Sequence, residues 1–346
     1  MRVPVISKKK AQMINVLLIG PGRIGKKYLE VLATDKRVIL AGVVGSNREK
    51  ASAVVPPGCT AYGSDELSQA VESLPAGSLV VVATSEWSHV NELSLLFGKD
   101  LYLIVEKPLV SSWSEYSRIR EKLTQHTRYV LPCFTSRFDQ RYVSAHALMR
   151  QQEIIPLYIC SRRNTDYVTA SRVFGKLSMP FWIVCHDIDL LRWFAGSDLV
   201  SVRASSRYRG KEPGAKDFIM AELTFLNGIK GYIESSWCGP PASVIAHHSD
   251  FRVLSDAGAV FIEMNTTSVC GIFNGTSIQP DVIDVCWQGH RPVGSTVNML
   301  RHFIDVIEGL QKPLVTLSDA VEALRTSEAI RLSLIRGDEV FLEEIN

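Results

Sequence analysis

The chain has 346 residues, 46% of them hydrophobic and 21% charged, so it is long enough for two domains with well-filled cores. Its 38 basic and 36 acidic residues give a formal net charge of +2, which provides no global attraction to nucleic acids or membranes. Neither a membrane span nor a secretory signal is expected, because no long apolar run occurs. The seven scattered cysteines form no CxxC pair, which favours reduced thiols in a cytoplasmic protein.

The first predicted element is an apolar strand over Ile14–Ile19, followed by Gly20-Pro21-Gly22-Arg23-Ile24-Gly25 and a run of helix formers. In this position a GxGxxG motif is typical of dinucleotide binding. Gly20 permits the tight turn, Gly22 lets the backbone approach a pyrophosphate, and Gly25 lets helix and strand pack closely. The free N–H groups at the helix N-terminus would attract the phosphates. We therefore expect this turn, including Arg23 and Ile24, to bind a dinucleotide.

The rest of the first third alternates strands and helices. Apolar strands are predicted at 38–44, 78–84, 101–105 and 129–131, with helices at about 47–55, 65–73, 87–98 and 112–125. Continuous apolar strands separated by helices predict a parallel sheet covered on both faces. The sequence thus favours a doubly wound Rossmann domain over residues 1–132, preceded by a short basic extension that contains Lys8-Lys9-Lys10.

The pattern changes after residue 132. Helices are predicted near 139–151, 184–195, 296–311 and 317–335, and strands at 157–162, 200–208, 218–226, 229–237, 251–255 and 260–264. Short turns such as Asn227-Gly228 join neighbouring strands as hairpins. We expect residues 133–346 to form an α+β domain with an open, mostly antiparallel sheet for substrate binding and oligomerisation, whose last helix packs back on the first domain.

Several short motifs follow the glycine turn in a fixed order. They are Ala83-Thr84 with His89, Gly98-Lys99, Glu106-Lys107-Pro108, Ser136-Arg137-Phe138-Asp139, His186-Asp187-Ile188-Asp189, Arg301-His302-Phe303-Ile304-Asp305 and Pro313-Leu314-Val315-Thr316. Together they resemble the Gfo/Idh/MocA oxidoreductases over nearly the whole chain. The resemblance implies that Lys107 contacts the reacting hydroxyl or carbonyl and that His186 belongs to the catalytic constellation. It further implies that Glu106, Thr84 and His89 serve the cofactor site and that Arg137 serves the substrate site.

A lysine at this strand end is chemically suited to the role, since an ammonium in a partly dry cleft stabilises a developing alkoxide. One position departs from the family. Sugar dehydrogenases of this family usually carry an aspartate four residues before the histidine, where this chain has Trp182. Trp182 either stacks on a substrate or nicotinamide ring or simply packs the cleft. Lys107 would then act with His186, or with an acid among Asp166, Tyr167 and Asp187, while Asp189 is expected to be a structural partner.

The end of the second strand bears on cofactor choice. NAD-selective sites usually place an acidic residue there to bind the ribose 2′-hydroxyl, and this chain has Gly45. Ser46 and Arg48, or Lys50, could bind a 2′-phosphate through charge-assisted hydrogen bonds. We therefore predict a preference for NADP over NAD, with Ser46, Asn47 and Arg48 near the phosphate. No pattern of metal ligands is present.

These observations predict an NAD(P)-dependent oxidoreductase that transfers hydride between nicotinamide and a carbinol or ketone carbon of a sugar, nucleotide-sugar or cyclitol. Two alternatives remain open. One is reduction of an imine or unsaturated ring on the same fold, and the other is a dinucleotide-binding sensor without turnover. A homo-oligomer, dimer or tetramer, is expected, with Phe225, Tyr232 and Trp237 as candidate contacts.

Overall fold

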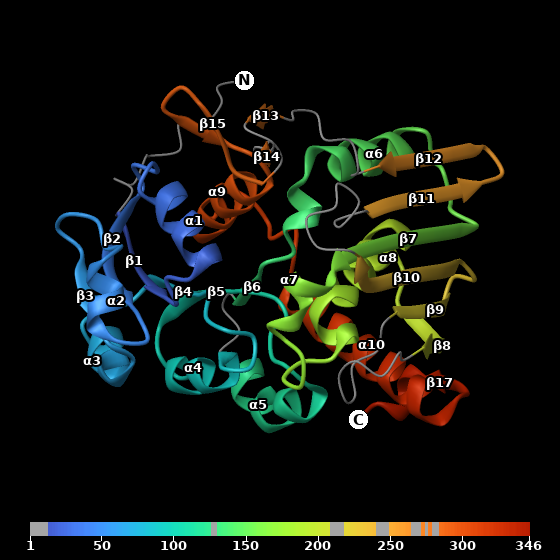
Figure 1. The fold of residues 1–346 in the computed structure, drawn as a ribbon, viewed down its shortest axis with the longest axis horizontal. Coiled ribbons are helices and arrows are strands. Elements are labelled where there is room, and N and C mark those ends of the chain that lie inside the picture. The colour runs from blue at the N-terminus through green and yellow to red at the C-terminus, as the bar shows by residue number, and fades with distance from the viewer. Residues whose placement is uncertain are drawn as a thin grey trace, which may run out of the picture.

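The computed structural model describes residues 13–125, 130–207, 218–239, 249–263, 271–273, 276–278 and 284–346 (Figure 1). The basic run at 8–10 lies outside the described residues. Two sheets stand side by side in Figure 1, with the N-terminal sheet at the left and the C-terminal sheet at the right.

The N-terminal sheet is parallel and has the strand order β3-β2-β1-β4-β5-β6. Its strands are β1 (Ile14–Ile19), β2 (Val38–Val44), β3 (Thr60–Tyr62), β4 (Ser78–Val82), β5 (Leu101–Val105) and β6 (Val130–Pro132). Its helices are α1 (Arg23–Leu32), α2 (Arg48–Ser52), α3 (Leu67–Glu72), α4 (His89–Leu96) and α5 (Trp113–Gln125). The strand order reverses between β1 and β4, and ligands bind at that point in doubly wound sheets.

The C-terminal sheet has the order β12-β11-β7-β10-β9-β8-β17, and its neighbours are antiparallel except for β7 and β10. Its strands are β7 (Tyr158–Asp166), β8 (Leu199–Arg207), β9 (Phe218–Phe225), β10 (Lys230–Gly239), β11 (Ser249–Ser255), β12 (Gly258–Glu263) and β17 (Glu339–Phe341). The helices of this part are α6 (Gln140–Gln151), α7 (Tyr167–Ser171), α8 (Cys185–Ala195), α9 (Ser295–Ile307) and α10 (Leu317–Arg336). Two short hairpins, β13–β14 (Gly271–Phe273, Thr276–Ile278) and β15–β16 (Cys286–Gln288, Arg291–Val293), precede α9.

The predicted fold class is confirmed: a parallel Rossmann sheet followed by an open, mostly antiparallel one. Helices α8 and α10 contact strands of the second sheet, and α10 also contacts β6 and α5 of the first. Helix α9 lies beside α1 (Figure 1). The division of the chain at residue 132 stays a prediction.

Two features of the second sheet bear on oligomerisation. Phe225 and Trp237 are buried, so these two side chains are not available as surface contacts. Tyr232 lies on the opposite face, where Met220, Leu254 and Phe261 are exposed.

Within the described part of the chain, no helix has both the length and the apolar character needed to cross a bilayer.

Candidate active site

A cleft of about 1240 Å³ opens at the carboxyl ends of the first sheet. Its second wall comes from β7, α7, the start of α8 and a π-helical turn over Pro180–Val184. Ten of the residues predicted for cofactor, substrate or chemistry line this one cleft: Gly20, Gly22, Arg23, Ile24, Ser46, Thr84, Glu106, Lys107, Trp182 and His186. The cleft therefore joins the glycine turn at one end to Lys107 and His186 at the other.

The glycine turn has the geometry that its motif predicts. Gly20 has φ +92°, and a Cβ there would lie 2.6 Å from the backbone nitrogen of Thr84. Gly22 caps α1 with an ordinary φ of −74°, and a Cβ added to it would meet no atom within 4 Å. A Cβ on Gly25 would collide with the carbonyl oxygen of Gly20. Gly20 and Gly25 thus shape the turn, whereas Gly22 keeps space in the cleft open.

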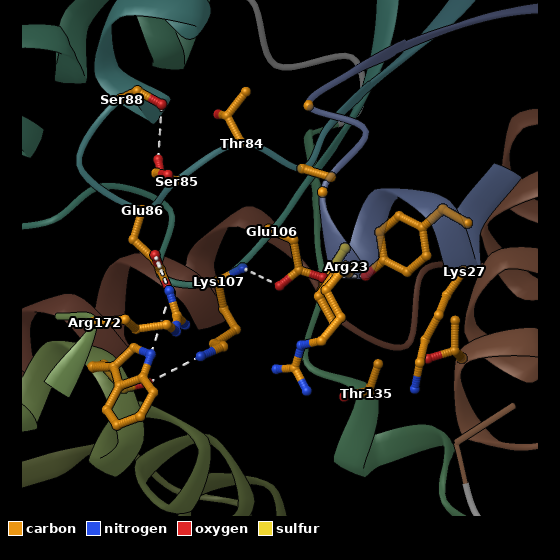
Figure 2. Close-up of a pocket in the computed structure, with 18 of the residues that line it drawn as sticks. Arg23, Lys27, Thr84, Ser85, Glu86, Ser88, Glu106, Lys107, Thr135 and Arg172 are labelled. Carbon is orange, nitrogen blue, oxygen red and sulfur yellow. Dashed lines mark hydrogen bonds and ion pairs between the residues drawn. The ribbon is translucent and has the colours of Figure 1, made fainter. Parts of the chain in front are cut away.

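Lys107 follows β5, and hydrogen bonds fix both its backbone and its side-chain ammonium. Its backbone N–H donates to Glu106 Oε2 at 3.1 Å (Figure 2). The Tyr28 hydroxyl donates to the other oxygen of that carboxylate. The Lys107 ammonium donates to the main-chain carbonyl of Trp182 at 3.0 Å. Burial raises the pKa of Glu106. Because its two oxygens accept from Tyr28 and from the backbone of Lys107, this carboxyl anchors the end of the strand. An ammonium has three donors, so the bond to Trp182 leaves capacity for a substrate oxygen.

His186 lies near the start of α8, and its Nδ1 atom is buried without a hydrogen-bond partner among the described residues. Burial lowers the pKa of His186 well below its usual value, and the positive charges of Lys107 and Arg163 lower it further. The imidazole is therefore neutral near pH 7. His186 lines the cleft, and a neutral imidazole there can take part in proton transfer.

Two residues that sequence reasoning did not single out complete this end of the cleft. Glu86, in the loop after β4, binds Arg172, which follows α7, and both line the cleft. Figure 2 shows the two side chains meeting beside Lys107. No local motif marks either residue. They contact each other only in the folded chain, because they are 86 positions apart in the sequence.

Arg137 lies elsewhere than expected. Its side chain is buried away from the cleft lining, where its guanidinium binds Asp189 at 2.6 Å and Asp319 at 3.1 Å. It also donates to the carbonyl of Leu314 at 3.0 Å. Asp189 is thus a structural partner, as expected, and its partner is Arg137. Because Arg137 does not line the cleft, we do not propose it as a substrate ligand.

His89 also lies behind the cleft wall. Its Nδ1 is 2.9 Å from the carbonyl oxygen of Pro108, and its Nε2 is 3.4 Å from that of Thr84. Burial lowers the pKa of His89, so a neutral ring spans the two loops that carry Thr84 and Lys107. His89 does not line the cleft, and its role in cofactor binding stays a prediction.

The predicted phosphate ligands divide into two groups. Arg48 forms an ion pair with Glu66 on the surface, and the Asn47 side chain caps α2 by accepting from the N–H of Lys50. Neither lines the cleft, whereas Ser46 and Lys50 do. A lysine that sequence reasoning named only as an alternative is therefore better placed than Arg48.

The three alternative acids have structural partners and do not line the cleft. Asp187 accepts from Ser161 at 2.6 Å and from Arg163 at 3.0 Å. Asp166 caps α7 by accepting from the N–H of Thr169, and Tyr167 packs on Phe174.

Within the described ranges, no group of three or more His, Cys, Asp or Glu side chains is arranged to hold a metal ion.

Two family models match the chain and together cover more than half of it. The oxidoreductase family with an NAD-binding Rossmann fold matches residues 14–134, and the GFO/IDH/MocA C-terminal domain matches residues 165–261. The match to inositol 2-dehydrogenase of Pseudarthrobacter chlorophenolicus is 26% identical over 56% of this chain and 57% of that protein. The match to scyllo-inositol 2-dehydrogenase (NAD(+)) of Bacillus subtilis is 25% identical over 78% of this chain and 79% of that protein. The chain thus spans less than two thirds of the first of these relatives.

Solved structures with the same fold cover nearly the whole chain. GenD2 from gentamicin A biosynthesis, in complex with NAD, has a TM-score of 0.79 at 21% identity, covering 99% of each chain. The scyllo-inositol dehydrogenase from Lactobacillus casei, with NAD(H) and scyllo-inositol bound, has a TM-score of 0.78 at 17% identity, covering 96% of this chain and 100% of that one. With both family models matched in order along the sequence, this chain belongs to the Gfo/Idh/MocA family of oxidoreductases.

Proposed function

We propose that the chain is an NAD(P)-dependent dehydrogenase that oxidises a carbinol carbon of a cyclitol or a related sugar, or reduces the corresponding ketone. The observation that carries this proposal is the single cleft that joins the glycine turn to Lys107 and His186. The inositol dehydrogenases among the relatives support a cyclitol as the substrate class.

The glycine turn fits a dinucleotide. A Cβ at Gly22 would project into open space at the N-terminus of α1, where a pyrophosphate can approach the backbone N–H groups. When bound, the nicotinamide supplies the hydride acceptor or donor. Ile24, within the glycine turn, and Thr84, after β4, also line the cleft, and we assign both to cofactor contact.

The remaining chemistry is proton transfer and charge stabilisation. In the oxidative direction the substrate hydroxyl passes its proton to the neutral imidazole of His186, which lines the cleft. The Lys107 ammonium donates a hydrogen bond to the same oxygen and stabilises the alkoxide as it forms. Because Trp182 O holds that ammonium, little reorganisation is needed at the reacting atom.

Charge at this end of the cleft favours an uncharged substrate. Arg163 is paired with Asp187, and Arg172 is paired with Glu86. An anionic group placed at either arginine would have to compete with a carboxylate of the protein, whereas the Lys107 ammonium is used by the reacting oxygen. A polyol meets the same donors and acceptors without that competition.

At the cofactor's adenosine end we propose a preference for NADP. Gly45 places no carboxylate against a 2′-phosphate, and a side chain there would crowd the backbone, with a Cβ 2.8 Å from the carbonyl oxygen of Asn47. Ser46 and Lys50 line the cleft beside it and supply a hydroxyl and an ammonium. This assignment replaces Arg48 with Lys50.

We further propose that the chain forms a homo-oligomer through the outer face of the second sheet, where Tyr232, Met220, Leu254 and Phe261 lie. The cytoplasmic location expected from the sequence stays a prediction.

The function is tested by mixing the full chain with myo-inositol or scyllo-inositol and with NAD⁺ or NADP⁺. We expect the absorbance of reduced nicotinamide to grow with at least one pair. The Lys107→Met variant is the control, since it should bind cofactor without comparable turnover. A chain that binds the dinucleotide yet oxidises neither cyclitol, and reduces neither corresponding ketone, would refute the cyclitol assignment and favour a sensor.

A further inference from the structure

Glu86 is a carboxylate that the proposed chemistry leaves unused, and it is 7% exposed at the wall of the cleft. Arg172 donates to both of its oxygens, with Nη2 to Oε1 at 2.7 Å and Nη1 to Oε2 at 3.1 Å. The indole N–H of Trp182 donates to Oε1 at 3.2 Å. Glu86 comes from the loop after β4, whereas its two partners come from the segment between β7 and α8, so these contacts cross the cleft.

The same contacts fix Trp182 at two points. Its indole is bound to Glu86, and its main-chain carbonyl accepts from the Lys107 ammonium at 3.0 Å. The Arg172 guanidinium lies 5.3 Å from the centre of the indole ring, within the range of a cation–π contact. Trp182 also lies in a π-helical turn, a local distortion often found at functional sites. A shift of the indole would therefore disturb the carbonyl that holds Lys107.

We propose that Glu86, together with Arg172, is a positioning residue for the reaction: it holds Trp182 as a rigid wall for the substrate ring, and the Trp182 carbonyl holds Lys107 at the reacting oxygen. We call Glu86, Arg172 and Trp182 the indole clamp. The inference rests on the proposed function, because it takes Lys107 as the residue at the reacting oxygen. We do not assign proton exchange to Glu86, because its hydrogen bonds from Arg172 and Trp182 favour the ionised carboxylate.

The chemistry of the clamp fits a ring-shaped polyol. The indole offers an apolar surface to the C–H face of such a ring. Arg172 lines the cleft with its side chain 47% exposed, and its guanidinium has five N–H donors, of which Glu86 takes two. The remaining donors can reach hydroxyls on the rim of the ring. Because the Arg172 side chain is half-exposed, its ion pair with Glu86 adds little to stability, so positioning is the more economical explanation of the pair.

The charged and titratable groups around Glu86 predict a spectroscopic test. Burial raises its pKa, but the Arg172 hydrogen bonds and the charges of Lys107 and Arg172 outweigh this and hold the pKa below its usual value. Glu106 and His89 also interact electrostatically with Glu86. If Arg172 is removed while the burial remains, the pKa of Glu86 should rise, and Glu86 should protonate at a higher pH than in the unaltered chain.

The experiment follows the indole ¹H–¹⁵N resonances of the six tryptophans while the pH is lowered, with Trp182→Phe to assign the signal. We expect the Trp182 signal to show an acid-side step that moves to higher pH in Arg172→Met and disappears in Glu86→Gln. Lys176→Met is the matched control, because it removes a nearby cation that lies over Trp87 without touching Glu86. A Trp182 signal that titrates alike in all of these variants overturns the clamp.

The kinetic arm uses the cyclitol that the chain turns over. Glu86→Gln and Arg172→Met should each lower kcat about 10- to 100-fold, the scale of a misplaced reacting group, while the Kd for cofactor stays nearly constant. The double variant should be little worse than the slower single variant, because both act through Trp182. Turnover that is insensitive to Glu86→Gln refutes the positioning role alone. Absence of turnover in the unaltered chain refutes the proposed function and the positioning role with it.

Discussion

The ammonium of Lys107 donates a hydrogen bond to the main-chain carbonyl of Trp182, 3.0 Å away. The lysine follows strand β5 of the first sheet, and the tryptophan precedes the helix that carries His186. This bond joins the two walls of the cleft at the point where the chemistry is proposed. Trp182 thus orients Lys107 through its main-chain carbonyl. The sequence analysis considered only its indole, either stacked on a ring or packed in the cleft.

Lys107→Met tests the central assignment. Methionine keeps the length and the apolar stem of lysine but removes the charge, so turnover should fall about 10²- to 10⁴-fold, the usual scale of lost proton transfer or oxyanion stabilisation. Cofactor affinity, measured by calorimetry, should change far less. Lys176→Met serves as the control, because Lys176 lies over the Trp87 ring and does not line the cleft. Full activity of Lys107→Met on the chain's substrate would remove Lys107 from the mechanism.

Gly22→Val tests the dinucleotide site without straining the fold. Gly22 has φ −74° and open space before it, so a side chain is tolerated in the unbound chain but would occupy the space of the pyrophosphate. We expect cofactor binding to be lost while the midpoint of thermal unfolding stays nearly unchanged. Gly20→Val is the contrast, because φ +92° and a contact with Thr84 make it costly to the fold itself. Unchanged cofactor affinity in Gly22→Val would contradict the assignment.

Much of the fold could be predicted because its strands are continuous apolar runs between amphipathic helices. The predicted strand at 14–19 and the helix near 317–335 match β1 and α10 closely. The sequence analysis missed β3, Thr60–Tyr62, and β17, Glu339–Phe341. Both are short strands at sheet edges, and β17 pairs with a strand more than 130 residues away, so neither has a local apolar pattern to mark it.

Candidate site residues could be predicted where they stand in a sequence motif. They could not be predicted where their role depends on a contact that forms only in the folded chain. Lys107 and His186 stand in motifs whose order along the chain identifies the family, and both line the cleft. Arg48 and Arg137 seemed available as ligands because a sequence does not show that Glu66 and Asp189 neutralise them. For the same reason Glu86 could not be found, since its partners only meet it in the folded chain.

Lys50→Met tests the revised view of cofactor choice. If the Lys50 ammonium binds a 2′-phosphate, the variant should weaken NADPH binding by about 1.5 kcal/mol, the lower end for hydrogen bonds to charged groups, and leave NADH binding nearly unchanged. Arg48→Met is the matched control, because Arg48 is exposed, pairs with Glu66 and does not line the cleft. Titrating each variant with both cofactors separates the two. Equal losses for NADPH and NADH would show that Lys50 does not distinguish the phosphate.

Arg137→Met tests whether this arginine is structural. Its guanidinium neutralises Asp189, whose side chain is fully buried, and it also binds Asp319. Removing one partner of a buried ion pair leaves an uncompensated charge, so we expect the free energy of unfolding to fall by about 3–5 kcal/mol in denaturant titrations. Asp189→Asn in the same background should recover part of the loss, because it removes the orphaned charge. KM should stay close to that of the unaltered chain wherever the variant remains folded. A raised KM with unchanged stability would instead return Arg137 to the substrate site.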